Sequence, residues 1–224
     1  MPAAKGRDIM QRRVIGVLAA TPIDTAMGVD VVKSAGFSHV SRYLSPNPAE
    51  QTKLQVLETS KLTEMTLALC EALTEEGAEG IFLYCNSLAG AIDMQGIRAR
   101  LSVRIVTPLD VYAHLAGEHS SIAVLAANCQ SLAAIERTMR TANPNCAVYG
   151  SGLLPLVEKI ESGASPEAIV DELKMAGLVR ALCSMGGEIL VLGCTHFAYL
   201  AEQITAVSDL PVIDPARTML GMLA

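Results

Sequence analysis

An internal repeat constrains the fold of this chain more than any other feature. Three segments of its first half recur in the second half, in the same order and at offsets of 107 to 109 positions. The pairs are Val14–Ala20 with Ser121–Ala127, Cys85 with Cys194, and Ile105–Pro108 with Val212–Pro215. Apolar strands resemble one another, so each match alone is weak, but three in one order indicate a duplicated unit. We therefore expect two similar α/β halves, 14–112 and 118–212, with the tail 213–224 packing on the first half.

The expected secondary structure alternates short apolar strands with helices. Strands are expected at 14–20, 39–44, 81–84, 103–106, 122–127, 147–149, 189–192 and 212–213. The main helices are expected at 26–35, 50–76, 132–141 and 166–185, with Ser165 capping the last one. Such alternation favours helices packed on mostly parallel sheets. The predicted fold is therefore α/β, with two pseudo-symmetric parallel-sheet halves.

The composition excludes several classes of function. The chain has 224 residues, of which 51% are hydrophobic, and a net charge of −6. Its length allows a large core, and its acidic balance offers nucleic acid no broad basic surface. The apolar run Val14–Ala20 follows basic residues and imitates a signal peptide, but nearly the same run recurs in mid-chain. No apolar stretch approaches the roughly 20 residues that span a bilayer, so we expect no membrane partner.

The cysteines suggest reactive rather than structural chemistry at two positions. The six cysteines lie at 70, 85, 129, 146, 183 and 194. None forms a CxxC or a zinc-type spacing with histidine, so we expect no metal site. A chain this rich in core residues needs no disulfide framework, and a reducing cytosol is the simplest setting. The four cysteines other than Cys85 and Cys194 are interpreted as structural.

Cys85 and Cys194 share one local pattern. Each follows an apolar strand and precedes small polar residues and a predicted helix, as in Cys85-Asn86-Ser87 and Gly193-Cys194-Thr195-His196. Open α/β sheets bind ligands at the carboxyl ends of their strands. A helix start also favours anions, so a thiol there ionises more readily. Both cysteines are therefore candidate catalytic groups.

Two opposed thiols can invert a carbon centre if the halves face each other. One thiolate would remove the proton from one face of Cα, and the other thiol would protonate the opposite face. Asn86, Ser87 and Thr195 are candidate donors to the substrate carboxylate as the carbanion forms. Thr21 and Asn128 begin equivalent loops and are further candidate substrate contacts. His196 is expected to orient or polarise Cys194, or to assist proton transfer.

The two cysteine segments resemble those of a known family. Gly193-Cys194-Thr195-His196-Phe197 looks like the second cysteine motif of glutamate racemases, and Cys85-Asn86-Ser87-Leu88-Ala89 resembles their first. The wider group is the cofactor-independent aspartate/glutamate racemase superfamily. The resemblance implies two α/β domains, a cleft between them, and neither pyridoxal phosphate nor metal. It also implies a small acidic substrate, aspartate or glutamate, and is compatible with a homodimer.

One departure from the family pattern leaves the substrate open. Glutamate racemases carry Asp-Ser-Gly after the first strand, where this chain has Ala19-Ala20-Thr21. Asp24 lies slightly further on and could substitute, although Asp24 and Asp214 are also typical of helix-cap or structural acids.

Two other functions remain open on the sequence alone. The first is a maleate isomerase- or arylmalonate decarboxylase-like enzyme acting on a small dicarboxylate. The decarboxylase has a single cysteine, so the presence of both thiols counts against that member. The second is a non-catalytic, two-lobed ligand-binding protein.

Overall fold

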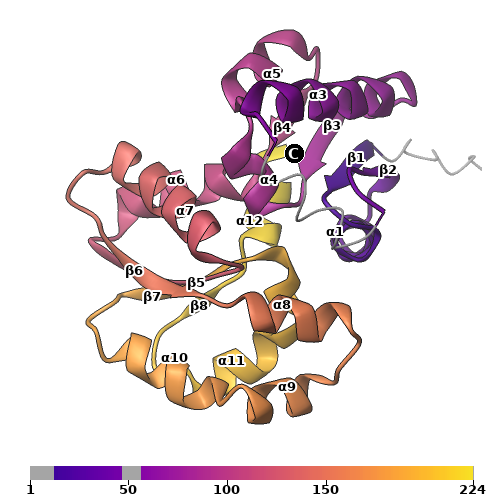
Figure 1. Ribbon diagram of the computed structural model, residues 1–224. Coiled ribbons are helices and arrows are strands. Elements are labelled where there is room, and N and C mark those ends of the chain that lie inside the picture. Colours follow the sequence, from indigo (N-terminus) through magenta and orange to yellow (C-terminus); the bar gives the residue numbers. More distant parts are fainter. Residues whose placement is uncertain (1–12, 47–56, 224) are drawn as a thin grey trace, which may run out of the picture.

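Two four-stranded parallel sheets form the framework of the protein (Figure 1). The computed structural model describes residues 13–46 and 57–223. The first sheet has the order β2-β1-β3-β4, from β1 (Val14–Ala19), β2 (Ser38–Tyr43), β3 (Gly80–Leu83) and β4 (Arg104–Val106). The second has the order β6-β5-β7-β8, from β5 (Ser121–Ala126), β6 (Ala147–Gly152), β7 (Ile189–Gly193) and β8 (Val212–Ile213). The repeated strand order confirms the predicted α/β class with two similar halves.

The helices form layers on both faces of these sheets. In the first half they are α1 (Pro22–Ser34), α3 (Thr59–Glu75), α4 (Asn86–Ala91), α5 (Met94–Arg100) and α6 (Pro108–Glu118). Those that follow are α7 (Cys129–Ala142), α8 (Leu154–Glu161), α9 (Pro166–Glu172), α10 (Met175–Cys183), the 3-10 helix η1 (Thr195–Leu200), α11 (Ala201–Val207) and α12 (Pro215–Leu223). Within the described residues, no helix combines the length and apolar character that crossing a bilayer requires.

A core shared by both sheets joins the halves. Side chains alternate between the two faces of a strand, so Val17 of β1 and Val124 of β5 enter one common cluster, together with Met219 of α12. Leu18 and Leu125, each one position along, face separate outer clusters instead. Helices α1, α6, α7 and α12 contribute to the common cluster. The two sheets therefore sit on either side of one helical layer.

Equivalent strand registers bring four loops to corresponding sheet edges. Leu18 of β1 pairs with Leu83 of β3, and Leu125 of β5 pairs with Leu192 of β7. The loops after these strands carry Thr21, Cys85, Asn128 and Cys194, each of which takes the N-cap position of the following helix. The duplicated topology therefore places both thiols at the carboxyl ends of the central strands.

The C-terminal helix α12 crosses back to the first half. It contacts β3, β4, α1 and α6, and Arg13 donates a hydrogen bond from Nη1 to the Leu223 carbonyl. The tail 213–224 was expected to pack on this half, and its helix does make these contacts. The domain limits 14–112 and 118–212 stay a prediction.

Two predicted helices differ from the structure. The helix expected at 50–76 begins at Thr59, because Glu58 is extended (φ −60°, ψ 139°); positions 50–56 lie outside the described residues. The helix expected at 166–185 divides at Lys174, whose φ is 52°. Ile169 and Met175, six positions apart, would point to different faces of one straight helix. The break lets both reach the same outer core cluster.

Two predicted loops are in fact helix starts. Residues 22–24, assigned to a loop, form the first turn of α1, because Thr21 caps it and Pro22 suits the first helical position. Similarly, Asn128 caps α7, which starts at Cys129 rather than at residue 132. Helix α8, Leu154–Glu161, was not anticipated. The predicted cap at Ser165 is confirmed by its bond from the Ala168 amide.

Candidate active site

The first thiol lies in a buried, hydroxyl-lined position. Cys85 precedes α4 with an extended backbone and is 3% exposed. Its Sγ lies 3.4 Å from the Ser87 Oγ. Burial, and next the nearby Asp24 carboxylate, raise the pKa of the Cys85 thiol to about 12, against a lowering by the Ser87 hydrogen bond. Cys85 is therefore a neutral thiol near pH 7 in the absence of a ligand.

The second thiol has a charged neighbour. The Cys194 Sγ lies 3.7 Å from His196 Nδ1, and both residues are buried. On the other side of the ring, His196 Nε2 lies 2.6 Å from Glu161 Oε1. Burial lowers the pKa of His196, but Asp24, Cys194 and Glu161 together raise it well above its ordinary value. The ring is an imidazolium near pH 7, able to hydrogen-bond a thiolate at Cys194.

Asp24 links the two halves at this point. It lies on α1 of the first half, yet its Oδ1 accepts a 2.6 Å hydrogen bond from Thr195 Oγ1 of the second. The same oxygen is 3.7 Å from His196 Nδ1. Burial raises the pKa of Asp24, while His196 and Thr195 oppose that rise. Asp24 thus belongs to the site, beyond the cap or structural role that the sequence favoured.

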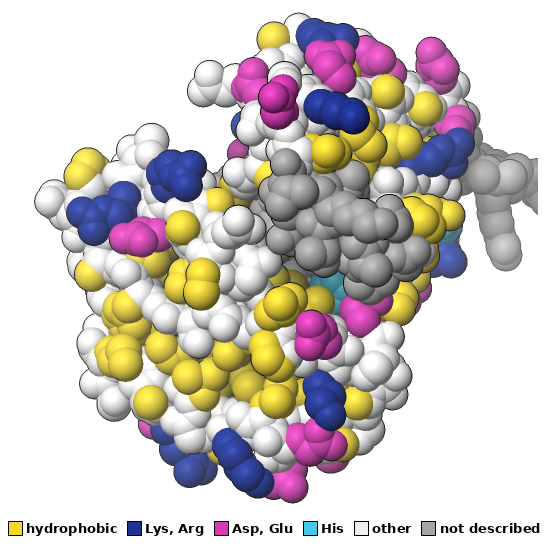
Figure 2. Space-filling model, in the orientation of Figure 1, with side chains coloured by type: hydrophobic (Ala, Val, Ile, Leu, Met, Phe, Trp, Pro, Cys, Tyr) yellow, Lys and Arg dark blue, Asp and Glu magenta, His cyan; other side chains and the backbone are white. Residues whose placement is uncertain are grey.

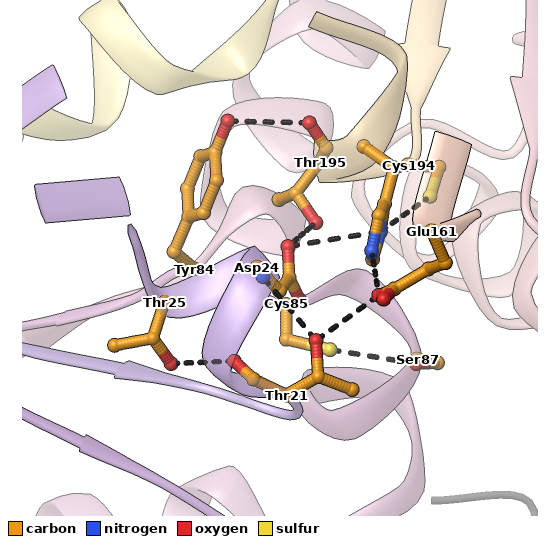
Figure 3. A network of polar contacts seen from close by, with 10 residues as sticks. Thr21, Asp24, Thr25, Tyr84, Cys85, Ser87, Glu161, Cys194 and Thr195 are labelled. Atoms are coloured by element: carbon orange, nitrogen blue, oxygen red, sulfur yellow. Dashed lines mark hydrogen bonds and ion pairs between the residues drawn. The ribbon is translucent and has the colours of Figure 1, made fainter. Parts of the chain in front are cut away.

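Thr21 and Glu161 complete the polar network drawn in Figure 3. The Thr21 hydroxyl accepts from the Asp24 amide at 3.2 Å and donates to Glu161 Oε1 at 3.1 Å. Burial raises the pKa of Glu161, but hydrogen bonds from His196 and Thr21 bring it below its ordinary value. Glu161 was missed at the sequence level. It ends an amphipathic helix far along the chain, and nothing local distinguishes it from a surface acid.

Two buried tyrosines connect the cysteine loops. Tyr84 Oη donates to the Thr195 carbonyl at 3.3 Å, joining the residue before Cys85 to the residue after Cys194. Tyr112 Oη donates to Asn86 Oδ1 at 2.6 Å. Burial raises the pKa of each phenol well above the ordinary value for tyrosine, so each hydroxyl remains a hydrogen-bond donor at neutral pH. The bond from Tyr112 occupies the oxygen of the Asn86 amide, whose nitrogen has no partner among residues 13–46 and 57–223.

Three buried polar atoms around the thiols have no hydrogen-bond partner among the described residues. They are Asp24 Oδ2, Asn86 Nδ2 and Ser131 Oγ. An unpaired buried polar atom costs about 1–3 kcal/mol, so such atoms mark places where a ligand would supply the partner. One is an anionic acceptor, one is an amide donor and one is a hydroxyl.

The structure brings together all but one of the predicted site residues. Contacts or electrostatic coupling connect the set Cys85, Cys194, His196, Asn86, Ser87, Thr195 and Thr21. Asn128 stands apart: its Oδ1 accepts from the Ser131 amide at 2.8 Å, and it lines an adjoining cavity with Ser87. A larger cavity of about 490 Å³ lies at β4 and α12, and no described cysteine or histidine lines it.

Comparisons with known proteins give relatives in sequence and in structure. No family model matches the chain. A glutamate racemase from Ralstonia pickettii is 27% identical over 172 residues, which are 70% of this chain and 57% of that protein. The chain therefore spans little more than half the length of the curated relatives it matches.

Solved structures show the same fold over nearly the whole chain. The glutamate racemase of Francisella tularensis, crystallised with D-glutamate, superposes with a TM-score of 0.72 at 18% identity and covers 96% of this chain and 80% of its own. The aspartate racemase of Picrophilus torridus gives 0.68 at 12% identity, covering 94% and 92%. The chain is thus similar in sequence to glutamate racemases and has the fold of the glutamate and aspartate racemases. Open α/β sheets bind ligands at the carboxyl ends of their strands, so the loops after β3 and β7 form the candidate site.

Proposed function

We propose that this protein is an amino-acid racemase that needs no pyridoxal phosphate and acts on aspartate or glutamate. Cys85 and Cys194 would serve as acid and base on opposite faces of Cα. The observation that carries the proposal is the pair of thiols at equivalent strand ends, coupled electrostatically and enclosed in one buried polar network. The relatives named glutamate racemase support the reaction class.

The unpartnered atoms favour a substrate with an amino group. Asp24 Oδ2 is a buried acceptor without a partner among the described residues, and an α-ammonium group would satisfy it. Asn86 Nδ2 is a free donor for the α-carboxylate. A simple dicarboxylate such as maleate offers no cation to Asp24 and would be repelled by it. The maleate isomerase alternative is thereby disfavoured.

The proposed reaction conserves protons between the two thiols. For one enantiomer, a Cys194 thiolate, hydrogen-bonded by the His196 imidazolium, takes the Cα proton. The Cys85 thiol gives its proton to the other face of the carbanion, which leaves Cys85 as a thiolate and inverts the centre. The other enantiomer follows the same path in reverse. Donors at Asn86 and Ser87 would stabilise the negative charge that develops on the substrate carboxylate; the Thr195 hydroxyl, expected from the sequence to do the same, donates to Asp24 Oδ1 instead.

Substrate binding would itself make Cys85 more acidic. The Asp24 carboxylate is, after burial, the main cause of the raised pKa of Cys85. A substrate ammonium beside Asp24 would offset that charge, so the pKa of Cys85 would fall toward the operating pH. Efficient proton transfer requires such matching. The thiol would thus be held neutral until an amino acid occupies the site.

Deuterium exchange tests the proposal directly. Each enantiomer of aspartate and glutamate is incubated with the protein in D2O, and Cα–H loss is followed by NMR with chiral analysis of the product. We expect exchange coupled to inversion for at least one of the two amino acids. Turnover of maleate without amino-acid exchange would replace the proposal with an isomerase. Binding of amino acids without any exchange would indicate a ligand-binding protein.

Assembly and location remain predictions. Light scattering after size-exclusion chromatography would test the expected homodimer. A reducing, cytosolic setting is proposed because all six cysteines are free thiols.

A further inference from the structure

The ring of Tyr84, directly before the first thiol, lies in a space that a glycine leaves open. Gly28 lies on α1, and a Cβ there would lie 3.0 Å from Tyr84 Cδ1 and 3.1 Å from Tyr84 Cβ. Val17 of β1 borders the same space, with its Cγ1 3.0 Å from that Cβ position. The Tyr84 ring also stacks on Phe82, with the ring centroids 5.3 Å apart. The absence of a side chain at position 28 therefore gives a large ring room before Cys85.

The second half fills the equivalent space with the sizes exchanged. An offset of 107 positions aligns Gly28 of α1 with Ile135 of α7. The offset of 109 that relates the two cysteines aligns Tyr84 with Gly193. A Cβ on Gly193 would lie 2.8 Å from Ile135 Cδ1, so here the helix supplies the large side chain and the end of the strand supplies none. A phenol therefore precedes the first thiol, whereas no side chain precedes the second.

The Tyr84 hydroxyl reaches the second half from this position. Its Oη donates to the Thr195 carbonyl at 3.3 Å, and Figure 3 shows the hydroxyl directed at that residue. Tyr84 directly precedes Cys85, and its partner directly follows Cys194. One hydrogen bond therefore joins the chain neighbours of both thiols. The Thr195 hydroxyl is also bound to the first half, through Asp24 Oδ1 at 2.6 Å, so the backbone and the side chain of Thr195 are both held.

The hydrogen bond from Tyr84 to Thr195 is shielded from solvent. The face in Figure 2 carries charged side chains over both halves, but Tyr84 is 0% and Thr195 is 4% exposed. A phenylalanine ring would fill the space beside Gly28 equally well, and a buried hydroxyl costs free energy unless it is hydrogen-bonded. Burial first, and then the carboxylates of Asp214 and Asp24, raise the pKa of Tyr84, so the hydroxyl stays a donor near pH 7.

We propose that Tyr84 is a positioning residue, which holds the loop after β7 against the loop after β3 and so sets the separation of the two thiols. The inference rests on the proposed function and adds a residue that acts through Thr195. Proton transfer on both faces of one carbon requires both sulfurs to lie within reach of Cα at once, and a misplacement of about 1 Å can cost about 100-fold in rate. Without the hydroxyl, the thiol that formed the carbanion would more often return a proton to the same face.

Tyr84→Phe removes the hydroxyl and keeps the ring. In the D2O assay we expect kcat for inversion to fall about tenfold with KM within about twofold, because reacting geometry is lost and no substrate contact is. We also expect the ratio of Cα–H exchange with retention to exchange with inversion to rise about tenfold. Tyr199→Phe is the matched control and should behave like the wild type. Its hydroxyl also donates to a carbonyl at 3.3 Å, that of Ala164, but within the second half and from a residue that is 42% exposed.

A reagent with two alkylating arms measures the thiol geometry without turnover. Dibromobimane becomes fluorescent only when both of its arms have alkylated thiols. In the Cys129→Ser background, fluorescence with peptide mass spectrometry reports the bridging of Cys85 and Cys194. The bridging rate is divided by the rate of the first alkylation, so a change in thiol reactivity alone does not count. We expect Tyr84→Phe to lower this quotient about tenfold and Tyr199→Phe to leave it unchanged.

The outcomes separate this inference from the proposed function. If Tyr84→Phe keeps the wild-type kcat, exchange ratio and bridging quotient, or if Tyr199→Phe changes them equally, the positioning role is wrong. Racemisation by the wild type would then leave the proposed function standing without it. If bridging depends on Tyr84 but neither amino acid is racemised, Tyr84 still sets the thiol separation and the proposed function fails. A wild type in which the two thiols cannot be bridged would overturn the inference, because the thiols would not face each other.

Discussion

The loops after β3 and β7 are equivalent in the fold but different in chemistry. Each loop places a cysteine at the N-cap of the following helix. The strands before the loops are also equivalent, since β3 lies next to β1 in one sheet and β7 lies next to β5 in the other. Cys85 faces a hydroxyl, that of Ser87. Cys194 faces His196, which is backed by the Glu161 carboxylate. The duplicated fold therefore places the two thiols at equivalent positions, while side chains that differ between the two halves surround them.

The two thiols therefore differ in their electrostatic surroundings, as the proposed acid and base would require. The pKa of Cys85 is raised to about 12, so that thiol is neutral. The pKa of His196 is also raised, so a positively charged imidazolium lies beside Cys194. Titratable groups whose environments diverge are the expected acid and base of a catalytic pair. The asymmetry originates in residues from elsewhere in the chain, Asp24 on α1 and Glu161 on α8.

The largest expected effect comes from removing either thiol. Cys85→Ser and Cys194→Ser should each lower racemisation about 1,000-fold, because a serine hydroxyl is a far weaker acid and base on its face of Cα. Initial rates of inversion in both directions measure the effect. Cys129→Ser, which changes an exposed cysteine, should leave the rates unchanged. Retention of exchange and inversion by both serine variants would exclude the two-thiol mechanism.

Asp24→Asn should have the next largest effect, about 100-fold in kcat/KM, because it removes the acceptor for the substrate ammonium. It should also lower the pKa of Cys85, since the Asp24 carboxylate raises it.

The pKa change can be read without substrate, from the alkylation of Cys85 by iodoacetamide at pH 8 in the Cys129→Ser background. The thiolate fraction, and hence the rate, should rise in Asp24→Asn. A slower reaction would contradict the electrostatic role. Asp30→Asn, on the exposed side of α1, is the matched control.

Glu161→Gln tests the asymmetry at Cys194 and should lower kcat about tenfold. Hydrogen bonding to Glu161 helps to raise the pKa of His196, so the pKa in the variant should fall, as measured by NMR titration of the ring. The ion pair stabilises the fold fully between the ordinary pKa of glutamate and that of histidine, and this contribution is lost as the pH falls through the lowered pKa of Glu161 or rises through the raised pKa of His196. Glu158→Gln, exposed on the same helix, should titrate and react like the wild type.

Tyr112→Phe should have the smallest effect, about a fivefold increase in KM with kcat little changed. The Tyr112 hydroxyl bonds Asn86 Oδ1 and so directs Nδ2 toward the site. Without it, the amide can rotate and lose its preset orientation. An equal fall in kcat and kcat/KM would instead indicate a role confined to the transition state. The thermal unfolding midpoint serves as a check that the core is intact.

The internal repeat and the two cysteine segments were enough to predict the α/β class, the two halves and most of the residues that gather around the thiols. These features are local in sequence: a buried strand is an apolar run, and a thiol at its carboxyl end lies at a sheet edge. The start of α3 and the break at Lys174 were not predictable in this way. Both depend on how the helices pack on the sheet rather than on the apolar pattern itself.

By itself, the sequence determined where the chain would place its two thiols, because strand ends and helix starts follow from short-range patterns. Only the tertiary structure decided which charges surround them. Asp24 reaches Thr195 across 171 positions, and Glu161 reaches His196 across 35. Coulomb interactions depend on distance in space and on burial, and neither quantity can be read from the separation of two residues in the sequence. The chemical difference between two matching cysteines is therefore a property of the folded molecule.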